Sequence, residues 1–438
     1  MEYEGNVYQS YTGDGFSESG VNNLSGVAKI KVIGVGGAGN NAVDRLIESG
    51  LNSAEYVVVN TDNQALARSK ATKRIQIGVK LTKGLGAGAD PTVGKAAAEE
   101  NKEEIRAALK DTDLLFITAG MGGGTGTGAA PEIAKIAKEM KILTVAVVTL
   151  PFTFEAKRRM DNALAGIEEL KKSVDSIITI PNDKIRQVVP KETSFTDALK
   201  VADEVLRQGI RGIAELIVKP SLINLDFADV KTTLKGRGLA HMGIGVAKGE
   251  KRVLDAVRCA VGSPLLNTTI EGASSVILNV IGGKDLSLDE VITAADLVKG
   301  VIDYSANVIF GACIDEHMSD EVEVVIIATG FNSGESSFGF SGQNPSLKQV
   351  ADLSNKIDSA YQYRNGTVAE TPTFDGGIYA NQQVPQSQPL YAQPVQQMPS
   401  VFEPDDPIPD TAEQQPTDRK HRPKFVDFFM RKNSEDKS

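Results

Sequence analysis

The residues best suited to chemistry in this sequence lie in one glycine-rich stretch, from Gly120 to Gly128. Glycine has no side chain, so its backbone N–H group can approach a ligand closely, and threonine hydroxyls can add further donors. The residues that would supply these donors are Gly122, Gly123, Gly124, Thr125, Gly126, Thr127 and Gly128. Such a set of donors suits an anion, and a chain of phosphate groups in particular.

The segments on either side of this stretch predict how it is held. Residues 114–118 form a short apolar run of buried-strand length, and residues 129–138 have apolar positions at helical spacing. A loop that leads from a strand into the N-terminus of a helix gains the partial positive charge of that terminus. A flexible linker is the alternative, but it would not connect a buried strand to a well-formed helix. The stretch is therefore predicted to be a phosphate-binding loop.

Two further glycine-rich loops follow predicted strands. The first follows residues 29–35, and the second occupies residues 84–90, after a possible strand at 75–79 and before a helix predicted from about 92 to 109. Their candidate ligand-binding residues are Gly36, Gly37, Ala38, Gly39, Asn40 and Asn41 in the first loop, and Ala87 and Gly88 in the second. Because the carboxyl ends of parallel strands meet at one edge of a sheet, three such loops would surround a polyphosphate with backbone donors.

A dinucleotide-binding enzyme is the main alternative. Gly34, Gly36 and Gly39 satisfy the pattern G-x-G-x-x-G, and Asp62 lies near the position expected for an acid that binds a ribose. Taken alone, these residues would indicate an NAD(P)-dependent oxidoreductase. A single match to this pattern is weak evidence, however, and the loop ending at Gly128 has no role in dinucleotide binding.

Charged residues further along the chain are the other candidates for chemistry. Glu155 and Arg159 are four residues apart and would share one face of a helix, for which a solvated ion pair is the simplest interpretation. Asn224, Asp226 and Asp229 follow a long predicted helix. Two carboxylates can orient an attacking water or hold a hydrated cation, and a neighbouring amide can help to position it. A solvated turn is the alternative, which the apolar residues between these positions make less attractive.

Composition limits the class of protein. The chain has 438 residues and a net charge of −10, which argues against a general nucleic-acid binder. Two cysteines in apolar settings indicate buried thiols in a reducing compartment, and three scattered histidines form no zinc-ligand cluster. No apolar run reaches the length of a membrane span, and the acidic, polar start is not a signal peptide. We therefore expect a cytoplasmic protein that does not insert into membranes.

The pattern of elements predicts an α/β protein with two domains. Alternating strands and helices predict a mostly parallel, doubly wound, Rossmann-like sheet, followed by a long helix and a second α/β domain. Eleven of the 18 prolines lie beyond residue 331, which indicates a disordered linker. The predicted parts are a disordered tail at 1–28, a nucleotide-binding domain at 29–192, a central helix at 193–219, a C-terminal α/β domain at 220–331, a disordered linker at 332–418 and a docking peptide at 419–438.

Several of these motifs together resemble the tubulin/FtsZ family of GTPases, in particular its bacterial FtsZ branch. The resemblance rests first on residues 122–128 and extends in order from about Lys29 to Phe331. The other matching segments are 36–41, 60–62, 84–89, 149–155 with Arg159, 181–183, Asp203 and 224–229. It implies a GTPase domain that binds GTP or GDP, with Mg²⁺ at the phosphates, and a protein that forms head-to-tail protofilaments in a division ring at midcell.

The resemblance also assigns roles to single residues. Asn182 and Asp203 would contact the base, where a carboxylate accepts hydrogen bonds from the N1–H and amino groups of guanine. Asn224, Asp226 and Asp229 would carry out hydrolysis. Because Asp203 is separated from that acidic segment by about 22 Å of helix, the acidic segment is expected to act on the nucleotide of a neighbouring subunit.

Two departures from the family pattern affect partners and base contacts. In the family this position is often a phenylalanine that stacks on the base. This chain has Leu199 there, so weaker stacking is expected. The basic, phenylalanine-rich segment Phe425–Arg431 is predicted to dock on membrane-tethering and other division proteins, although it differs from the family's usual tail peptide. The remaining alternative is a nucleotide-binding protein that polymerises without hydrolysis, and the presence of Asp226 and Asp229 argues against it.

Overall fold

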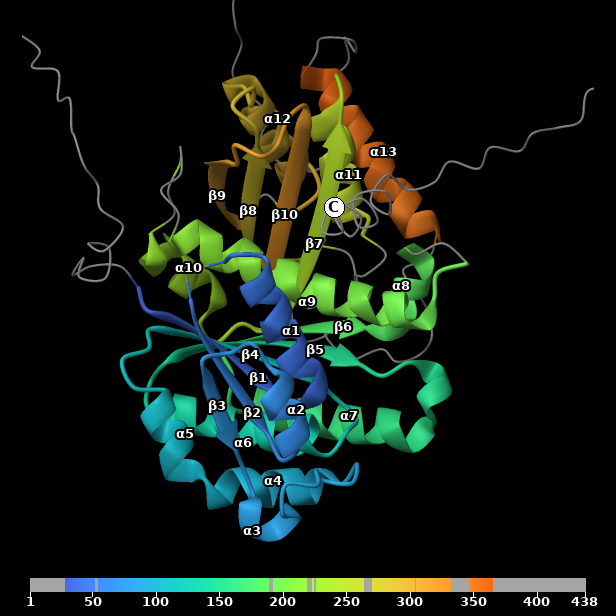
Figure 1. The fold of residues 1–438 in the computed structure, drawn as a ribbon. Coiled ribbons are helices and arrows are strands. Elements are labelled where there is room, and N and C mark those ends of the chain that lie inside the picture. Colours follow the sequence, from blue (N-terminus) through green and yellow to red (C-terminus); the bar gives the residue numbers. More distant parts are fainter. Residues whose placement is uncertain are drawn as a thin grey trace, which may run out of the picture.

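A computed structural model describes residues 28–51, 54–188, 192–218, 223, 226–263, 270–303, 305–331 and 347–364. The described strands form one continuous ten-stranded sheet in the order β3-β2-β1-β4-β5-β6-β7-β10-β8-β9 (Figure 1). Residues 1–27 of the predicted tail and the whole predicted docking peptide lie outside the described residues.

Six parallel strands form the N-terminal part of this sheet, as the sequence predicts. They are β1 (Ile30–Val35), β2 (Glu55–Asn60), β3 (Lys73–Gln76), β4 (Leu114–Gly120), β5 (Leu143–Leu150) and β6 (Ser176–Pro181). The helices that connect them are α1 (Gly36–Glu48), α2 (Asn63–Arg68), α3 (Val79–Thr82), α4 (Pro91–Glu100), α5 (Lys102–Ala108), α6 (Thr125–Glu139), η2 (Thr153–Glu155), α7 (Lys157–Lys171) and α8 (Asn182–Val188).

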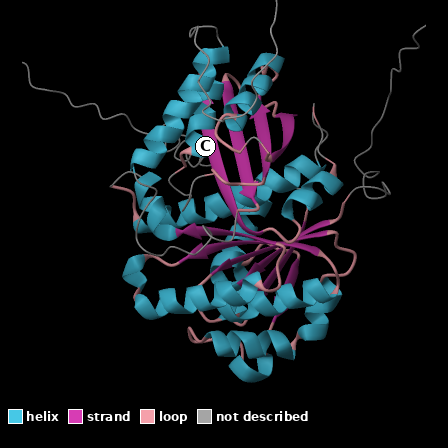
Figure 2. Ribbon diagram, turned by 180° about the vertical axis from the view of Figure 1, so that it is seen from behind, coloured by secondary structure: helices cyan, strands magenta, loops and turns pink. Residues whose placement is uncertain are grey.

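The parallel strands are buried between two layers of helices, which Figure 2 shows above and below the strands. Successive residues of a strand point to opposite faces, so each strand contributes to two cores. Val32 and Phe116 pack in the core that contains α1 and the long helix α9 (Phe195–Val218), whereas Ile33 and Ile117 pack against α4 to α7. Because the strands are parallel, their carboxyl ends lie at one edge of the sheet, and the helices packed on both faces hold them there. The loops that follow these strands therefore start at the same edge.

Two expected elements differ in their limits. The strand expected at 75–79 is β3 at Lys73–Gln76, and Gly78 follows it with a φ of 65°, a left-handed conformation that glycine adopts readily. The helix expected from about 92 to 109 is divided into α4 and α5 at Asn101. The Asn101 side chain accepts a 2.9 Å hydrogen bond from the Gly78 N–H group, which joins this break to the end of β3.

The predicted central helix is α9 (Phe195–Val218), whose 24 residues extend over about 36 Å. Two glycines allow it to lie close to the C-terminal strands. A Cβ atom added to Gly209 would lie 2.9 Å from the Met242 Cε atom, and one added to Gly212 would lie 2.9 Å from a Val325 methyl carbon. A Cβ atom on Gly209 would also lie 3.5 Å from the Val147 Cγ1 atom of β5, so the helix packs against both parts of the sheet.

The C-terminal strands continue the sheet. After α10 (Phe227–Leu234), the chain forms β7 (Gly238–Lys248), α11 (Arg252–Val261), β8 (Ser275–Gly282), α12 (Leu288–Lys299), β9 (Asn307–Ile314) and β10 (Glu321–Thr329). Strand β10 lies between β7 and β8 and is antiparallel to both, and β8 and β9 are parallel. Parallel pairing of β6 with β7 joins the two halves. The expected second α/β unit is confirmed, but its strands extend the first sheet.

A helix within the predicted linker corrects the expectation of disorder there. Residues Leu347–Arg364 form α13, which lies beside α11 and α12 (Figure 1). Its Ile357 side chain is 1% exposed and belongs to the core of the C-terminal strands. Its Lys356 Nζ atom is 2.7 Å from Glu271 Oε1. Buried apolar surface and an ion pair therefore hold this helix against the C-terminal half.

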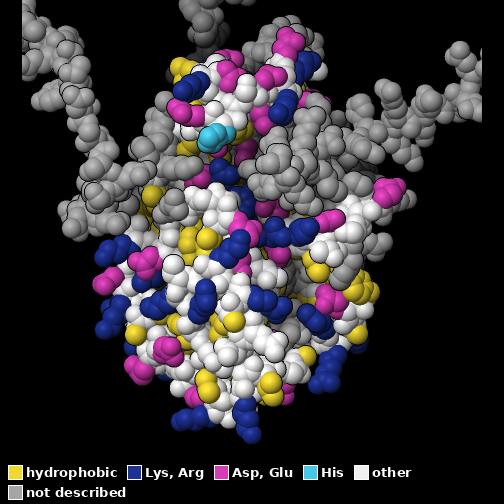
Figure 3. Space-filling view, viewed as in Figure 1, with side chains coloured by type: hydrophobic (Ala, Val, Ile, Leu, Met, Phe, Trp, Pro, Cys, Tyr) yellow, Lys and Arg dark blue, Asp and Glu magenta, His cyan; other side chains and the backbone are white. Residues whose placement is uncertain are grey.

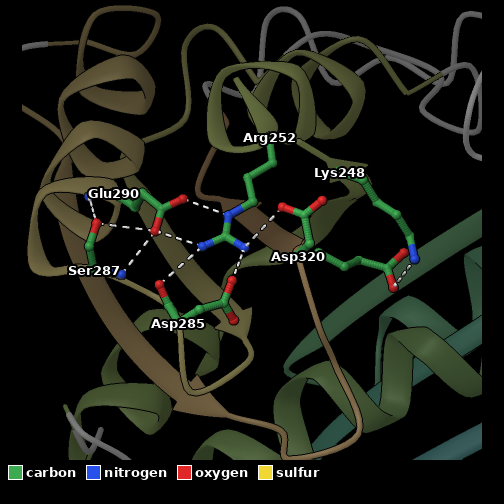
Figure 4. A network of polar contacts seen from close by, with 7 residues as sticks. Lys248, Arg252, Asp285, Ser287, Glu290 and Asp320 are labelled. Carbon is green, nitrogen blue, oxygen red and sulfur yellow. Dashed lines mark hydrogen bonds and ion pairs between the residues drawn. The ribbon is translucent and has the colours of Figure 1, made fainter. Parts of the chain in front are cut away.

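Charged side chains join three loops at the tip of the C-terminal half (Figure 4). Arg252, at the start of α11, lies 2.6 Å and 3.0 Å from the two carboxylate oxygens of Glu290 through Nε and Nη2. It also bonds Asp285, and its Nη1 atom is 3.9 Å from Asp320 Oδ1. Ser287 caps α12 in the same cluster. The planar guanidinium thereby fixes the beginning of α12 relative to α11 and the β9–β10 turn.

Candidate functional site

The first glycine loop passes directly from β1 into α1. Gly36 has a φ of 72°. A Cβ atom there would lie 2.9 Å from the Gly126 nitrogen, in the glycine-rich loop between β4 and α6, which we call the central loop. A Cβ atom on Gly39 would lie 2.3 Å from the Thr118 carbonyl oxygen. The buried amide of Asn40, in the orientation that satisfies both its atoms, donates to the carbonyl oxygens of Gly34 and Gly36 and accepts from Asn60. This loop is therefore rigid and touches the central loop.

The central loop connects β4 to α6, as the sequence predicts. Gly122 has a φ of 98°, and its N–H group donates a 2.8 Å hydrogen bond to the Thr127 hydroxyl. The hydroxyls of Thr125 and Thr61 are 2.7 Å apart. Thr127 is thus used to shape the loop, while Thr125 stands at the first position of α6, where the backbone N–H groups have no partner within the helix.

The third loop, residues 84–90, packs against the central loop. A Cβ atom on Gly124 would lie 2.7 Å from the Ala87 Cβ atom, and one on Gly94 would lie 2.2 Å from the Gly124 carbonyl oxygen. Asp90 ends the loop by capping α4, because its side chain accepts a 2.9 Å bond from the Thr92 N–H group. The three predicted glycine loops therefore meet in space.

Some glycines in these loops have no structural reason to be glycine. A Cβ atom added to Gly37 or Gly123 would have no heavy atom within 4 Å among the described neighbours, and neither residue has a positive φ. Gly88 is also open, but its φ of 58° explains its identity. The remaining role for Gly37 and Gly123 is to let a ligand reach the backbone.

Asp62, the candidate ribose ligand, lies at the N-terminus of α2. Its Oδ1 atom accepts hydrogen bonds of 2.8 Å from Gln64 N–H and 3.2 Å from Ala65 N–H. The residue therefore caps this helix, and only Oδ2 is left for a ligand. Asn41, the last candidate of the first loop, is exposed on α1.

Glu155 and Arg159 form an ion pair, with the Arg159 Nε atom 3.0 Å from Glu155 Oε2. The other oxygen of Glu155 accepts a 2.9 Å bond from the Phe152 N–H group. A Cβ atom on Gly122 would lie 2.6 Å from the Arg159 carbonyl oxygen, so this pair borders the central loop. The short turn η2 that carries Glu155 is fixed by Asp183, whose two carboxylate oxygens accept bonds from the Thr153 N–H group.

The two candidate base contacts are largely buried. The Asn182 side-chain oxygen has no hydrogen-bond partner among the described residues, although it is fully buried. Asp203 is paired with Arg45 of α1, with 3.3 Å between Oδ2 and Nε. Burial raises the pKa of Asp203 to about 6, although the positive charge of Arg45 opposes this shift. An acceptor without a partner and a largely buried carboxylate can select a ligand that presents N–H donors.

The acidic segment lies beyond the other end of α9. Asn224 falls outside the described residues. Asp226 caps α10 through a 3.3 Å bond from the Ala228 N–H group, and Asp229 is exposed in the first turn of that helix. Ile223 exchanges backbone hydrogen bonds with Ala312 of the edge strand β9. In Figure 1, α8 and α10 lie at opposite ends of α9, so these acids lie at the other end of α9 from the helix that begins with Asn182.

Sequence reasoning missed several residues that shape the site. Thr61 contacts Thr125, Asp183 holds η2, and Arg45 pairs with Asp203. Arg45 and Asp203 are 158 residues apart, so no local pattern connects them. Thr61 and Asp183 lie within two of the matching segments, 60–62 and 181–183. Their place in these segments could have identified them as residues of the site.

The described residues contain neither a metal-binding cluster nor a membrane-spanning helix. No group of three or more His, Cys, Asp or Glu side chains in that part of the chain could hold a metal ion. Within the same residues, no helix is long and apolar enough to span a membrane. The candidate centre consists of the backbone N–H groups of three loops that meet in space, together with two largely buried polar side chains, Asn182 at the start of α8 and Asp203 on α9.

Comparison with known proteins agrees with this geometry. The description "Tubulin/FtsZ family, GTPase domain" matches residues 29–190, and "FtsZ family, C-terminal domain" matches residues 238–332. An FtsZ dimer from M. jannaschii is similar, with 50% sequence identity and a TM-score of 0.67, over 69% of this chain and 88% of that one. CetZ2 from Haloferax volcanii, in a GTPγS-bound protofilament, has 21% identity and a TM-score of 0.61, over 77% of this chain and 99% of that one, which shows the shared fold.

Proposed function

The chain belongs to the tubulin/FtsZ family of GTPases, and on this premise we propose that it hydrolyses GTP and assembles head to tail into filaments at the division site. The observation that carries the proposal is the meeting of three glycine loops around backbone positions open to a ligand. Gly37 and Gly123 need to be glycine only if something approaches their N–H groups. A triphosphate supplies such a ligand, and the N-terminus of α6 adds favourable charge.

We propose guanine as the base. The glycine loops contact phosphates and cannot distinguish bases, so the choice falls to Asn182 and Asp203. An ionised carboxylate only accepts hydrogen bonds, and guanine offers two donors side by side, whereas the N1 atom of adenine is itself an acceptor. Adenine would leave the base-facing acceptor of Asp203 without a donor, and a buried acceptor without a partner costs about 1–3 kcal/mol, which is about tenfold or more in affinity. Mg²⁺ would bind with the phosphates, because it usually keeps several waters and takes few protein ligands.

Hydrolysis is proposed to occur between subunits. Asp226 and Asp229 are exposed at the far end of α9 and can orient a water for attack on a phosphate held by the next chain. The Glu155–Arg159 pair, which borders the central loop, would place a guanidinium beside the phosphates. The solved dimer of the M. jannaschii relative and the CetZ2 protofilament support self-association.

Exposed apolar side chains support a head-to-tail contact. Leu85, in the third glycine loop, is 85% exposed, and Phe154, next to Glu155, is 67% exposed. Phe310 is exposed on β9, the strand that pairs with Ile223. Exposed apolar side chains thus lie beside the glycine loops and on the strand that holds the segment before Asp226, and two such different surfaces suit a heterologous contact that propagates an open filament.

The remaining partners are proposed from sequence. Phe425–Arg431 would bind membrane-tethering and other division proteins and would bring the filament to midcell. Nucleic acid is not a proposed partner. On the face drawn in Figure 3, Lys and Arg alternate with Asp and Glu and form no continuous basic area that could follow a phosphate backbone.

One pair of assays tests the proposed function. Phosphate release and light scattering are followed together after addition of GTP, with GDP and ATP as controls. We expect scattering to rise only with GTP and to fall as phosphate accumulates. Equal responses to ATP would contradict guanine selection, and phosphate release without any scattering would contradict assembly. Identification of the nucleotide that co-purifies separates this function from that of an oxidoreductase, which would retain NAD(P).

A further inference from the structure

We infer that Arg45 is a positioning residue for guanine recognition, because it holds the Asp203 carboxylate ionised and fixed in orientation from the neighbouring helix α1. This inference deepens the proposed function and rests on the proposed role of Asp203 at the base. Nothing in the motif pattern of the sequence points to Arg45. Arg45 is assigned this role because its largely buried side chain contacts Asp203 from the last turn of α1.

The contact joins two helices that pack against each other. The Arg45 Nε atom is 3.3 Å from Asp203 Oδ2, and the two side chains are 25% and 14% exposed. Arg45 is the basic residue in the last turn of α1, and the first residues of the same helix form the first glycine loop. About 13 Å of helix separates Gly36 from Arg45. One rigid helix therefore contacts both the phosphate side and the base side of the site.

The charges around Asp203 make Arg45 important for keeping its carboxyl group ionised. Burial favours the protonated form of its carboxyl group, and the neighbouring Glu204 on α9 acts in the same direction. Arg45 is the positive group that opposes both effects. Arg207 is also close on α9, but its guanidinium pairs with Glu204. Asp203 therefore depends on Arg45 to remain charged near neutral pH.

The contact leaves room for the base. An ionised carboxylate has about four acceptor positions, and among the described residues only the Arg45 Nε–H group bonds this one. The N1–H and amino donors of guanine can therefore bind while Arg45 stays in place. A protonated Asp203 would have fewer acceptor positions than the carboxylate, and it would present an O–H donor to the base. Loss of Arg45 should thus weaken guanine binding most at the lower end of the neutral range.

The test measures GDP affinity between pH 5.5 and 8.5 for the wild type, Arg45→Gln and Arg45→Lys. Wild-type affinity should fall as the pH drops through about 6. In Arg45→Gln the midpoint should move up by about one unit, so that affinity is about threefold lower near pH 6.5 and approaches about tenfold lower near pH 5.5. Arg45→Lys should keep the wild-type midpoint because it keeps the charge. Arg68→Gln, at an exposed arginine that ends α2, is the matched control and should match the wild type throughout.

Two results would overturn the inference. If Arg45→Gln weakens binding equally at every pH, the residue has only a structural role. If Arg45→Lys behaves like Arg45→Gln, charge is not what matters. Thermal unfolding of each variant confirms that it is folded before affinity is compared.

A parallel measurement separates this inference from the proposed function. Asp203→Asn should bind GDP weakly and without the midpoint near pH 6. If Asp203→Asn binds like the wild type, the role of Asp203 at the base fails, and the inference fails with it. If Asp203→Asn loses affinity while Arg45→Gln keeps the wild-type midpoint, only the inference about Arg45 fails. Inosine diphosphate, which lacks the amino group of guanine, should lose its disadvantage against GDP in Arg45→Gln below the raised midpoint, where Asp203 is protonated, and keep it above that midpoint.

Discussion

The glycines of this protein fall into two groups whose substitution should have opposite effects. Gly128 is glycine for packing, since a Cβ atom there would lie 2.0 Å from the Pro91 carbonyl oxygen of α4. Gly37 has open space around it and a conformation that alanine tolerates. This difference separates residues that hold the loops together from residues that face a ligand, and the sequence alone cannot make that distinction.

We predict that Gly37→Ala folds normally, with a gain in stability of up to about 1 kcal/mol because alanine favours the helix, but binds GTP at least tenfold more weakly. Gly128→Ala should instead fail to fold, because backbone atoms of α4 occupy the space of the new methyl group. Thermal unfolding without nucleotide and GTP titration give the two quantities. Wild-type affinity in Gly37→Ala would show that no ligand approaches this backbone.

Asp203 should reduce the stability of the nucleotide-free protein at neutral pH. Its folded-state pKa of about 6 lies above the ordinary value of 3.8, so its contribution to stability is present below pH 3.8 and is lost as the pH rises through 6. We predict that Asp203→Asn is more stable than the wild type at pH 7.5, by up to about 3 kcal/mol. The difference should shrink as the pH falls from 6 to 4. Urea unfolding at several pH values measures it, and a constant difference would contradict the prediction.

At the level of elements, the sequence predicted the three strand–loop–helix units and the central helix because their signals are local. It missed α13 because few aliphatic residues lie in that segment. Spacing could have revealed it, since Ile357, Ala360 and Tyr361 are three and four residues apart and all pack against the C-terminal core. A helix that covers a core built elsewhere in the chain needs only a narrow apolar stripe.

We predict that α13 stabilises the C-terminal half. Ile357→Ala should lower the free energy of unfolding by about 2 kcal/mol or more, because it removes a fully buried side chain. Asn355→Ala, at an exposed position of the same helix, is the control and should change it by less than about 0.5 kcal/mol. Truncation after Phe331 should have at least the effect of Ile357→Ala, whereas truncation after Arg364 should be neutral. Equal stability of the two truncated chains would contradict a structural role for α13.

The Arg252 cluster gives a second prediction at this level. A lysine cannot reproduce the two parallel contacts that Arg252 makes with Glu290, so Arg252→Lys should destabilise the protein by about 1–3 kcal/mol. Lys248→Arg is the matched control, because Lys248 is exposed and its single contact with Glu321 requires no fork-shaped partner. Chemical unfolding compares the two variants. A cost for Lys248→Arg as large as that for Arg252→Lys would show that the Glu290 geometry is unimportant.

For the whole molecule, the sequence predicted the class of fold and the order of its parts, but it did not predict one continuous sheet. The joint between the halves is the pairing of β6 with β7, which involves segments more than 60 residues apart. The position of β10 between β7 and β8 is also non-local. Local periodicity defines a strand but not its neighbour, so this part of the architecture required the structure.

The last prediction concerns the distance between the two halves of the proposed catalytic centre. From Asp203 to the end of α9 the chain rises about 22 Å as a rigid helix, and Ile223 is then held against β9 before Asp226 begins α10. A segment held in this way cannot fold back to its own glycine loops. It can meet the loops of a neighbour that is stacked head to tail. Asp226→Ala and Asp229→Ala should therefore bind GTP with wild-type affinity and lose turnover, and wild-type specific activity should rise with protein concentration.

A mixing experiment makes this prediction decisive. Asp226→Ala retains intact glycine loops, and Gly37→Ala retains an intact acidic segment, so each chain can supply what the other lacks. Where the nucleotide of an Asp226→Ala subunit faces the acidic segment of a Gly37→Ala subunit, the catalytic centre is complete. Mixed filaments should therefore release phosphate faster than either variant alone at the same total concentration. The control is a mixture of Asp226→Ala with Asp229→Ala, in which no complete centre can form. Turnover by demonstrably monomeric wild-type protein, independent of its concentration, would refute the shared centre, because a single chain would then reach its own phosphate across the length of α9.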